Sequence, residues 1–317
     1  MSNTPTSVVA IGESLIDVVV PASGAPVTEH PGGSPMNIAL GLGRLGRPVT
    51  LVTRLGSDAR GAAIADHVRS AGVRLATGSL HDGPTSTATA HLRAGGSAEY
   101  LFDLDWSLPS GFTAADPALR AVGIVHAGSI AAFLEPGGAA VATLLAELRA
   151  TEHPPLITLD PNVRPSVVPD RAAAVARFVE LASSAAVVKL SDEDAAWLYP
   201  GSDVDAAADR ILELGPGLVT VTLGAAGALL ATRSVRCTAP GAAVTVADTI
   251  GAGDSFMSAL IDQLAALLDA GMPVAALRDG SGLDEAALAT IGAFAVRCAA
   301  ITVSRPGADP PRRAEVG

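Results

Sequence analysis

Residues 248–260 read DTIGAGDSFMSAL. The small residues Gly251, Ala252 and Gly253 leave backbone N–H groups uncovered where a helix-compatible run begins. Unpaired donors and the positive end of the helix dipole at such a start favour a phosphoryl group. Asp254 follows in the first turn, where its carboxylate can reach a substrate hydroxyl, as phosphoryl transfer to a small molecule requires. The alternative is an ordinary glycine turn capped by aspartate.

Charge and composition narrow the classes of partner. The 317-residue chain has a formal net charge of −11 without a compensating basic block, which argues against nucleic acid and anionic membranes and favours small ligands. Residues 1–7 lack the features of a signal peptide, and no unbroken apolar run of about 18 residues predicts a membrane span. We therefore expect a cytoplasmic protein. Cys237 and Cys298 are too few for a disulfide framework.

Lys189 is the only lysine in the chain. A P-loop needs a Gly-Lys dipeptide before Ser or Thr, so that the ammonium group reaches the β- and γ-phosphates. Lys189 follows Val188, so P-loop NTPases are excluded. Any nucleotide chemistry must rely on backbone amides, arginine, metal ions or this single lysine.

Apolar, turn-rich and helix-compatible segments alternate without a linker, which predicts one α/β domain over residues 1–317. This rhythm implies a parallel sheet with ligands at the carboxyl ends of its strands. Two alternating segments, 85–92 and 98–104, flank Gly95 and Gly96 and predict a hairpin with one solvated face. The expected strands are 7–11, 49–53, 123–126, 156–159, 186–189 and 218–223, residues 15–20 continue extended after the first of them, and expected helices include 36–45 and 60–71.

Residues 41–46 read GLGRLG and match the G-x-G-x-x-G pattern of dinucleotide-binding enzymes. In those enzymes the pattern follows a strand and opens a helix, whereas here it closes a helical segment that begins after Pro35. Close helix packing and a helix cap explain these glycines better. A dinucleotide-dependent dehydrogenase is therefore the weaker alternative.

Residues 31–39 read PGGSPMNIA. Gly32 and Gly33 allow backbone to approach a ligand, and Asn37 on the first helical turn offers a donor and an acceptor to a sugar hydroxyl. A simple helix cap is the alternative.

Residues 31–39 and 248–256 resemble the two signatures of the PfkB or ribokinase-like carbohydrate kinases, and GESLID at 12–17 resembles the opening of that family. The resemblance covers nearly the whole chain. It implies a ribokinase-like three-layer α/β/α core with a mostly parallel sheet and a small β-sheet lid, formed by about 13–33 and 85–105. It also implies a sugar kinase using ATP and Mg²⁺, with residues 251–254 as anion hole and Asp254 as general base.

The stretch DPNVRP at 160–165 is similar to the D-P-N-x-R-P stretch of fructokinases, so conversion of D-fructose to fructose 6-phosphate is the expected reaction. Arg164 offers a fork of donors to a phosphate or carboxylate, and Asn162 can serve a hydroxyl or phosphate. A surface salt bridge is the alternative for Arg164. A 2-keto-3-deoxygluconate kinase, another sugar, phosphosugar or nucleoside kinase, and a non-catalytic sugar-binding regulator remain open.

The resemblance also assigns the binding residues. The stretch KLSDED at 189–194 resembles the N-x-x-E region that supports Mg²⁺, with Ser191 and Asp194 in place of the usual Asn and Glu. Residues 192–194 could equally form the acidic first turn of a helix capped by Ser191. The sugar is expected at Asp17, Gly32, Gly33 and Asn37, with Arg164 nearby. ATP is expected at Asn162, Lys189, Asp194, Thr222, Gly224 and Gly227.

Residues 300–308 read AITVSRPGA and resemble the closing loop of the family. In relatives, carbonyl oxygens there can hold a monovalent cation beside the anion hole, and such a hard donor set suits K⁺. A plain turn before the tail is the alternative. The expected cation site comprises Asp248, Ile250, Thr302, Arg305 and Gly307.

An exposed edge strand of the lid could pair with that of a second subunit and form a homodimer.

Overall fold

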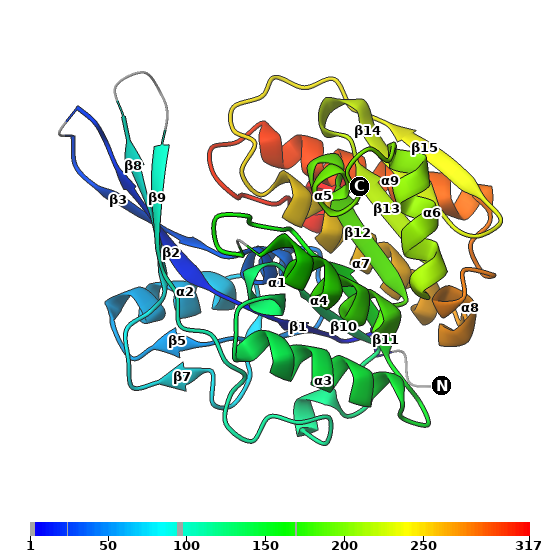
Figure 1. Cartoon of the computed structure of the whole chain (residues 1–317), viewed down its shortest axis with the longest axis horizontal. Coiled ribbons are helices and arrows are strands. Elements are labelled where there is room, and N and C mark those ends of the chain that lie inside the picture. The colour runs from blue at the N-terminus through cyan, green and yellow to red at the C-terminus, as the bar shows by residue number, and fades with distance from the viewer. Residues whose placement is uncertain (1–3, 24, 94–97, 169) are drawn as a thin grey trace.

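The computed structural model of the chain describes residues 4–23, 25–93, 98–168 and 170–317. In this part of the chain, nine strands form a central sheet in the order β15-β14-β13-β12-β11-β10-β1-β4-β6 (Figure 1). Neighbouring strands from β6 to β13 are parallel to each other, whereas β14 pairs antiparallel with both β13 and β15. The predicted mostly parallel sheet is confirmed. Its strands are β1 Val8–Ile11, β4 Val49–Val52, β6 Arg74–Leu75, β10 Ile124–Gly128, β11 Leu156–Asp160, β12 Val187–Ser191, β13 Leu218–Thr222, β14 Gly227–Ala231 and β15 Arg236–Pro240.

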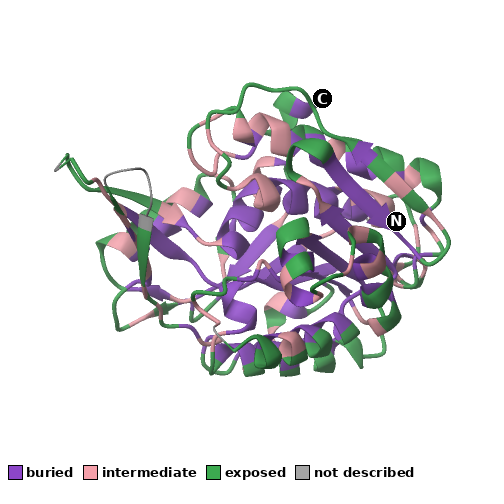
Figure 2. Cartoon of the chain, turned by 45° about the horizontal axis from the view of Figure 1, so that its top comes forward, coloured by how far each residue is buried: buried purple, intermediate pink, exposed green. Residues whose placement is uncertain are grey.

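Helices cover both faces of this sheet, so the core has the three layers expected (Figures 1 and 2). Successive strand residues point to opposite faces: Ala10 of β1 packs in one buried cluster, and Val9 and Ile11 pack in the other. One layer contains α1 (Ser34–Arg44), α2 (Ala59–Arg69), α7 (Ala252–Asp269) and α9 (Glu285–Val303). The other contains α3 (Gly137–Arg149), α4 (Arg171–Ser184), α5 (Asp192–Leu198) and α6 (Val204–Leu214).

A second sheet stands away from the core, at the left of Figure 1. Its strand order is β3-β2-β8-β9, with bounds Thr28–Gly32, Leu15–Val20, Thr87–Leu92 and Ala98–Asp103. The antiparallel pairing of β8 with β9 confirms the predicted hairpin. Its expected turn at Gly95 and Gly96 lies outside the described residues. All four strands fall within the segments assigned to the lid, 13–33 and 85–105.

Several predicted boundaries need correction. Strands β10, β11 and β12 extend one or two residues further than expected, so that Asp160 and Ser191 end their strands. Helix α1 begins at Ser34, because Pro35 fits the first helical turn. The predicted closing loop starts only after Val303, since residues 300–303 complete α9.

Helix α9 is long and apolar enough to cross a membrane by length and composition alone. In the fold it packs against α7, β14 and β15, and its Leu288, Ile291 and Ala295 are buried. Its apolar side chains therefore contribute to the core.

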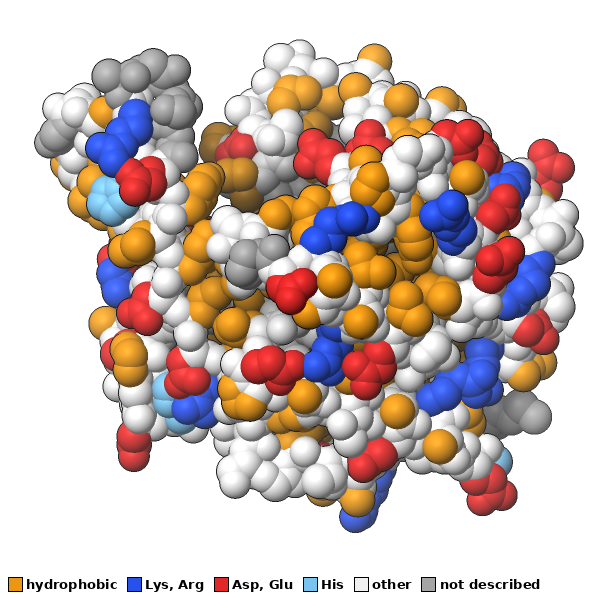
Figure 3. All heavy atoms as spheres, viewed as in Figure 1, with side chains coloured by type: hydrophobic (Ala, Val, Ile, Leu, Met, Phe, Trp, Pro, Cys, Tyr) orange, Lys and Arg blue, Asp and Glu red, His pale blue; other side chains and the backbone are white. Residues whose placement is uncertain are grey.

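The remaining described elements are short. Strands β5 (Leu55–Gly56) and β7 (Leu80–His81) pair with each other, and α8 (Val274–Arg278) and α10 (Arg313–Val316) lie late in the chain. The 3₁₀ turns are η1 (Pro117–Leu119), η2 (Ile130–Ala132) and η3 (Gly224–Ala226). Acidic and basic side chains are interspersed over the face shown in Figure 3, without a basic block.

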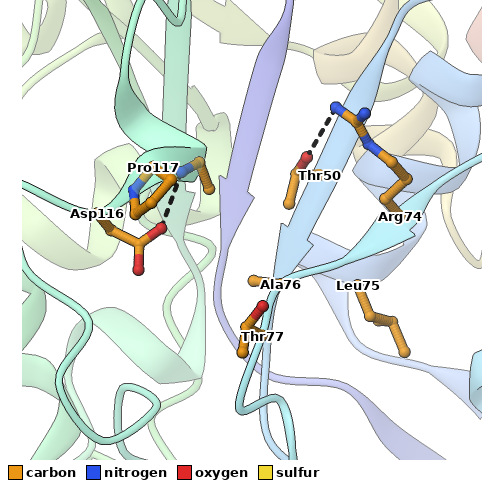
Figure 4. A pocket seen from close by; sticks show the side chains of 8 residues that line it. Thr50, Arg74, Leu75, Ala76, Thr77, Asp116 and Pro117 are labelled. Carbon is orange, nitrogen blue, oxygen red and sulfur yellow. Dashed lines mark hydrogen bonds between the residues drawn. The ribbon is translucent and has the colours of Figure 1, made fainter.

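A pocket of about 490 Å³ lies at the β6 edge of the central sheet (Figure 4). Thr50, Arg74 and Asp116 are among its lining residues, and Arg74 donates to the Thr50 hydroxyl at 3.5 Å. None of its lining residues belongs to either signature. The candidate site is built elsewhere, at the carboxyl ends of the strands.

Candidate active site

The start of α7 presents the amides that the sequence predicted. Gly251 is the N-cap residue with a left-handed φ of 76°, and Ala252 is the first helical residue. The first amides of a helix have no carbonyl partner inside it. Glycine supplies no capping side chain, and the Ala252 amide donates to the Thr249 carbonyl oxygen at 3.3 Å. The amides of Gly253 and Asp254 have no such bond within the described residues, and together with the helix dipole they form a place for an anion. Asp254 lies in this first turn, partly buried.

The carboxylate of Asp254 joins the two signature segments. The Ser34 hydroxyl donates to its Oδ1 at 2.6 Å, and Asn37 Nδ2 donates to its Oδ2 at 2.8 Å. Both donors come from the first turn of α1. Asn37 Oδ1 is buried and, among the described residues, has no hydrogen-bond partner. Because buried polar atoms are normally paired, this oxygen is available to a ligand hydroxyl beside Asp254.

The GLGRLG segment brings α1 against α7. A Cβ atom at Gly41 would lie 2.5 Å from the Ser258 hydroxyl oxygen, and one at Gly43 would lie 2.5 Å from the Ala71 carbonyl oxygen. Only glycine permits these approaches. The segment lies inside and just after α1, so the packing interpretation is confirmed and the strand-to-helix context of a dinucleotide site is not met.

The predicted sugar residues lie where the small sheet meets the core. A Cβ at Gly32 would lie 2.1 Å from Asp17 Oδ2, and one at Gly33, where φ is 107°, would lie 2.7 Å from the Glu13 carbonyl oxygen. Burial raises the pKa of Asp17 to about 6; His30 opposes the rise and Asp254 adds to it. The structure thus gathers Asp17, Gly32, Gly33 and Asn37 around Asp254.

Arg164 and Asn162 follow the carboxyl end of β11. The exposed Arg164 donates to the carbonyl oxygens of Asn162 at 3.4 Å and Val163 at 3.2 Å, and no ion pair of Arg164 is found within the described ranges. Its guanidinium is therefore free of a protein carboxylate there. Asn162 has a positive φ of 38°, and its Nδ2 donates to the Ser129 hydroxyl at 3.1 Å.

Lys189 forms a buried ion pair beneath the first turn of α7. Its Nζ lies 2.8 Å from Asp160 Oδ2, and a Cβ at Gly253 would lie 3.0 Å from the same Nζ. Burial raises the pKa of Asp160 to about 6, although Lys189 opposes the rise. Burial alone would lower the pKa of Lys189, but the negative charge of Asp160 outweighs it and raises this pKa. Asp160 Oδ1 is buried and has no partner among the described residues.

Asp194 lies at the start of α5, where it forms a capping box with Ser191. Its Oδ1 accepts the Val163 amide at 2.9 Å, and its Oδ2 accepts the amide and hydroxyl of Ser191 at 3.1 and 2.8 Å. Residue 194 thus falls at the position where a carboxylate closes a capping box. Asp194 anchors residue 163, and because a carboxylate can accept about four hydrogen bonds, its role at the nucleotide stays a prediction.

The other expected nucleotide residues follow β13. Thr222 ends this strand beside Ser191 of β12, and the exposed Gly224, with φ of 53°, begins η3. A Cβ at Gly227 would lie 2.0 Å from the Ala239 carbonyl oxygen. Gly227 is thus required by the close approach of β15, whereas Thr222 and Gly224 line the strand ends.

Hydrogen bonds join three of the five residues expected to hold a cation through their carbonyl oxygens. Asp248 Oδ1 accepts the Ile250 amide at 3.0 Å and its Oδ2 accepts the Gly307 amide at 2.9 Å, so three of the five residues meet. The Thr302 hydroxyl donates to the Cys298 carbonyl oxygen within α9, and Arg305 pairs with Asp309 and Glu315. Within the described ranges, no group of three or more His, Cys, Asp or Glu side chains is arranged to hold a metal ion.

Sequence reasoning did not select Glu13, Ser34 or Asp160 as site residues. Burial raises the pKa of Glu13 to about 7; the Ser129 hydroxyl and the Ala131 amide, which donates to Glu13 Oε2 at 2.9 Å, oppose the rise. The available signal was the position of both acids at the carboxyl ends of buried strands, β1 and β11. The bond from Ser34 depends on the crossing of α1 and α7, which no local pattern predicts.

The structure has a parallel α/β sheet and, at one helix start, a carboxylate next to backbone amides. Polar groups for a hydroxylated ligand lie beside them. These features together define a small-molecule phosphotransferase. The pfkB family carbohydrate kinase model matches residues 5–314. The chain belongs to this family and is a carbohydrate kinase, with a hydroxyl group as phosphoryl acceptor.

Similar proteins support this assignment. The chain is 33% identical over 316 residues to fructokinase-2 of Solanum lycopersicum, covering 96% of this chain and 92% of that protein. The Xylella fastidiosa fructokinase structure with bound ATP has a TM-score of 0.81 and 26% identity, covering 98% of this chain and 96% of that one. A double-mutant Vibrio cholerae fructokinase structure with fructose, ADP and potassium ion has a TM-score of 0.80 and 24% identity, covering 100% and 98%. The ribokinase-like fold is confirmed.

Proposed function

We propose that this kinase transfers the γ-phosphoryl group of Mg-ATP to D-fructose and forms fructose 6-phosphate. The observation that carries the proposal is the position of Asp254, in the first turn of α7 with Ser34 and Asn37 on its carboxylate. The identity to a fructokinase over nearly the whole chain supports the choice of sugar.

Each group at the site then has a chemical task. Asp17, Asn37 and the backbone at Gly32 and Gly33 hold the sugar hydroxyls. Asp254 accepts the proton of the attacking hydroxyl, and Ser34 and Asn37 orient its carboxylate. Positioned general-base catalysis typically contributes about 10²- to 10⁴-fold. The amides at residues 251–254 stabilise the charge on the transferring group, because fixed donors need no reorganisation during the reaction.

The nucleotide would lie over the ends of β12 and β13. Lys189, Thr222 and Gly224 would hold its phosphates, and Mg²⁺ bound with ATP would neutralise phosphate charge. The buried Asp160 Oδ1, which lacks a partner among the described residues, would accept a hydrogen bond from water bound to Mg²⁺. Asp194 supports the loop at residue 163 and is proposed to act at the nucleotide through water bound to Mg²⁺.

A sugar acid such as 2-keto-3-deoxygluconate is the second candidate substrate. Arg164 favours it, because its exposed guanidinium has no carboxylate partner in the described part of the chain. Arginine binds carboxylates with two parallel hydrogen bonds. Relative kcat/KM for fructose and the sugar acid distinguishes the two.

We further propose that the small sheet acts as a lid over the sugar and as the contact between two subunits. Its outer strand β9 carries exposed Tyr100 and Leu101, and exposed apolar strand edges invite pairing. Light scattering of the native protein and of Leu101→Glu tests this: a dimer that the variant converts to monomer supports it, and a native monomer contradicts it.

We propose a cytoplasmic location for the protein. We also propose that K⁺ activates it and is held by carbonyl oxygens around Ile250 and Gly307, beside Asp248. The donor set fits a hard monovalent ion, although Thr302 and Arg305 direct their side chains elsewhere. Equal turnover in sodium and potassium would contradict the activation.

The test of the function is ADP release with Mg-ATP against fructose, 2-keto-3-deoxygluconate, ribose, adenosine and fructose 1-phosphate. Turnover on fructose that falls about 10²- to 10⁴-fold in Asp254→Asn supports the proposal. Preference for another acceptor would change the assigned substrate and leave the proposed mechanism in place. Near-normal turnover of Asp254→Asn contradicts the base, and silence on every acceptor with retained sugar binding identifies a regulator.

A further inference from the structure

The segment after α9 packs directly against the anion hole. A Cβ at Gly251 would lie 2.6 Å from the Ala308 Cβ and 2.9 Å from its Cα. Ala308 therefore occupies the space in front of the glycine whose left-handed backbone begins α7. The position of Ala308 helps to set the direction of the first amides of the helix.

Hydrogen bonds anchor the residues on both sides of Ala308, and Arg305 Nη1 adds a longer contact of 3.3 Å to Asp309 Oδ2. On one side, the Gly307 amide donates to Asp248 Oδ2 at 2.9 Å. On the other side, Arg44 Nη1 lies 2.5 Å from Asp309 Oδ1 and 2.5 Å from the Pro310 carbonyl oxygen. The Arg44 side chain is 13% exposed and that of Asp309 is 43% exposed, so this interaction is partly shielded from water. Charged hydrogen bonds in such surroundings are stronger than exposed pairs.

Arg44 is the arginine of the GLGRLG segment and the last residue of α1. The close approach of α1 to α7 at Gly41 also brings Pro310 within 3.5 Å of the Gly41 Cβ position. The segment that resembles a dinucleotide fingerprint therefore packs two helices and directs one guanidinium at residues 309 and 310.

We propose that Arg44 is a positioning residue for phosphoryl transfer. By binding Asp309 and the Pro310 carbonyl, it holds Ala308 against Gly251 and so fixes the amides that receive the phosphoryl charge. The inference rests on the proposed function of residues 251–254. Because catalysis by fixed donors depends on their geometry, loss of this anchor acts on turnover more than on sugar binding.

The experiment compares Arg44→Met with Arg47→Met. Arg47 also ties the end of α1 to α7: its Nε lies 2.7 Å from the buried Asp262 Oδ1, and its side chain is 9% exposed. It does not contact residues 305–310 in the bonds found for it. We expect Arg44→Met to lower kcat by about 10- to 100-fold, the scale of a misplacement near 1 Å, with KM for fructose within about twofold. Arg47→Met lowers Tm and leaves kcat unchanged.

Asp309→Asn is the second variant, because a side chain that is 43% exposed tolerates the change and the charge of the anchor is lost. It should lower kcat in the same direction, by less than Arg44→Met. Unchanged kcat in either folded variant, or an equal loss in Arg47→Met, would overturn the inference. Full activity of Asp254→Asn would instead contradict the proposed mechanism of phosphoryl transfer. Failure of the Arg44 proposal and failure of the proposed function can therefore be told apart.

Discussion

Replacement of Gly251 by alanine tests whether the backbone at the start of α7 is the anion hole. Two effects are expected. An alanine at a φ of 76° destabilises the folded state by about 1–2 kcal/mol. Its Cβ would also lie 2.6 Å from the Ala308 Cβ, about 1 Å closer than the 3.5–4.0 Å optimum for two carbon atoms. One of the two backbones must therefore move by about that amount.

A shift of about 1 Å at donors that stabilise a transition state lowers the rate by roughly 10²-fold. We therefore expect Gly251→Ala to reduce kcat by about that factor, with KM for fructose within about twofold. The assay is steady-state ADP release at saturating fructose and Mg-ATP. The free energy of unfolding is measured alongside by urea denaturation.

The chain offers a matched control in Gly72. Its φ is 77°, and a Cβ there would meet no atom within 4 Å. Gly72→Ala should lose the same 1–2 kcal/mol of stability, roughly, from the left-handed backbone and keep its turnover. Wild-type kcat in Gly251→Ala, or an equal loss in Gly72→Ala, would refute the reasoning. Addition of Ala308→Gly to Gly251→Ala should recover a small part of the turnover, because it removes the contact at 2.6 Å but leaves the Ala308 Cα at 2.9 Å and the φ strain.

Three further predictions concern charges at the site. The pKa of Glu13 is raised from 4.5 to about 7 by burial, so the folded state binds more protons than the unfolded state between these values and stability falls as pH rises through this window. Asp17 and Asp160, with pKa values raised to about 6, contribute in the same direction. Glu13→Gln should therefore make the loss of stability between pH 5 and pH 7.5 smaller by on the order of 1–3 kcal/mol in urea denaturation; an equal loss in both proteins would contradict it. Lys189→Met should destabilise the fold by about 3–5 kcal/mol, because it leaves Asp160 buried and unpaired, and added Asp160→Asn should restore much of this; no recovery would refute the pairing argument. Arg164→Leu should raise KM for 2-keto-3-deoxygluconate at least about tenfold more than KM for fructose, from the loss of a charged hydrogen bond, whereas equal changes would argue against a carboxylate at Arg164.

Local patterns predicted most of the secondary structure. Buried strands such as Leu218–Thr222 read as short apolar runs between turn residues, because a parallel strand covered on both faces is apolar throughout. The hairpin of β8 and β9 was visible from alternation alone. Boundaries were less accurate: Asp160 and Ser191 continue their strands because pairing with neighbouring strands extends them.

Some residues of the candidate site could be predicted from local sequence, and others could not. Gly251, Gly253 and Asp254 were evident because small residues at a helix start have a local meaning. Asp194 matched a motif in sequence, and the structure adds that its carboxylate accepts hydrogen bonds from Ser191 and Val163. A motif names the residue type, and the neighbours in space decide which atoms remain free.

The family, the α/β class and the two signature segments can be recognised from residue types at short spacings. Tertiary structure alone decided that Ser34 and Asn37 meet Asp254, with sequence separations of 220 and 217 residues. It also showed that Arg44, which in sequence belongs to a pattern resembling a dinucleotide-binding site, binds residues 309 and 310. Such contacts arise from the crossing of α1 with α7, and packing between distant segments leaves no periodic trace in either one.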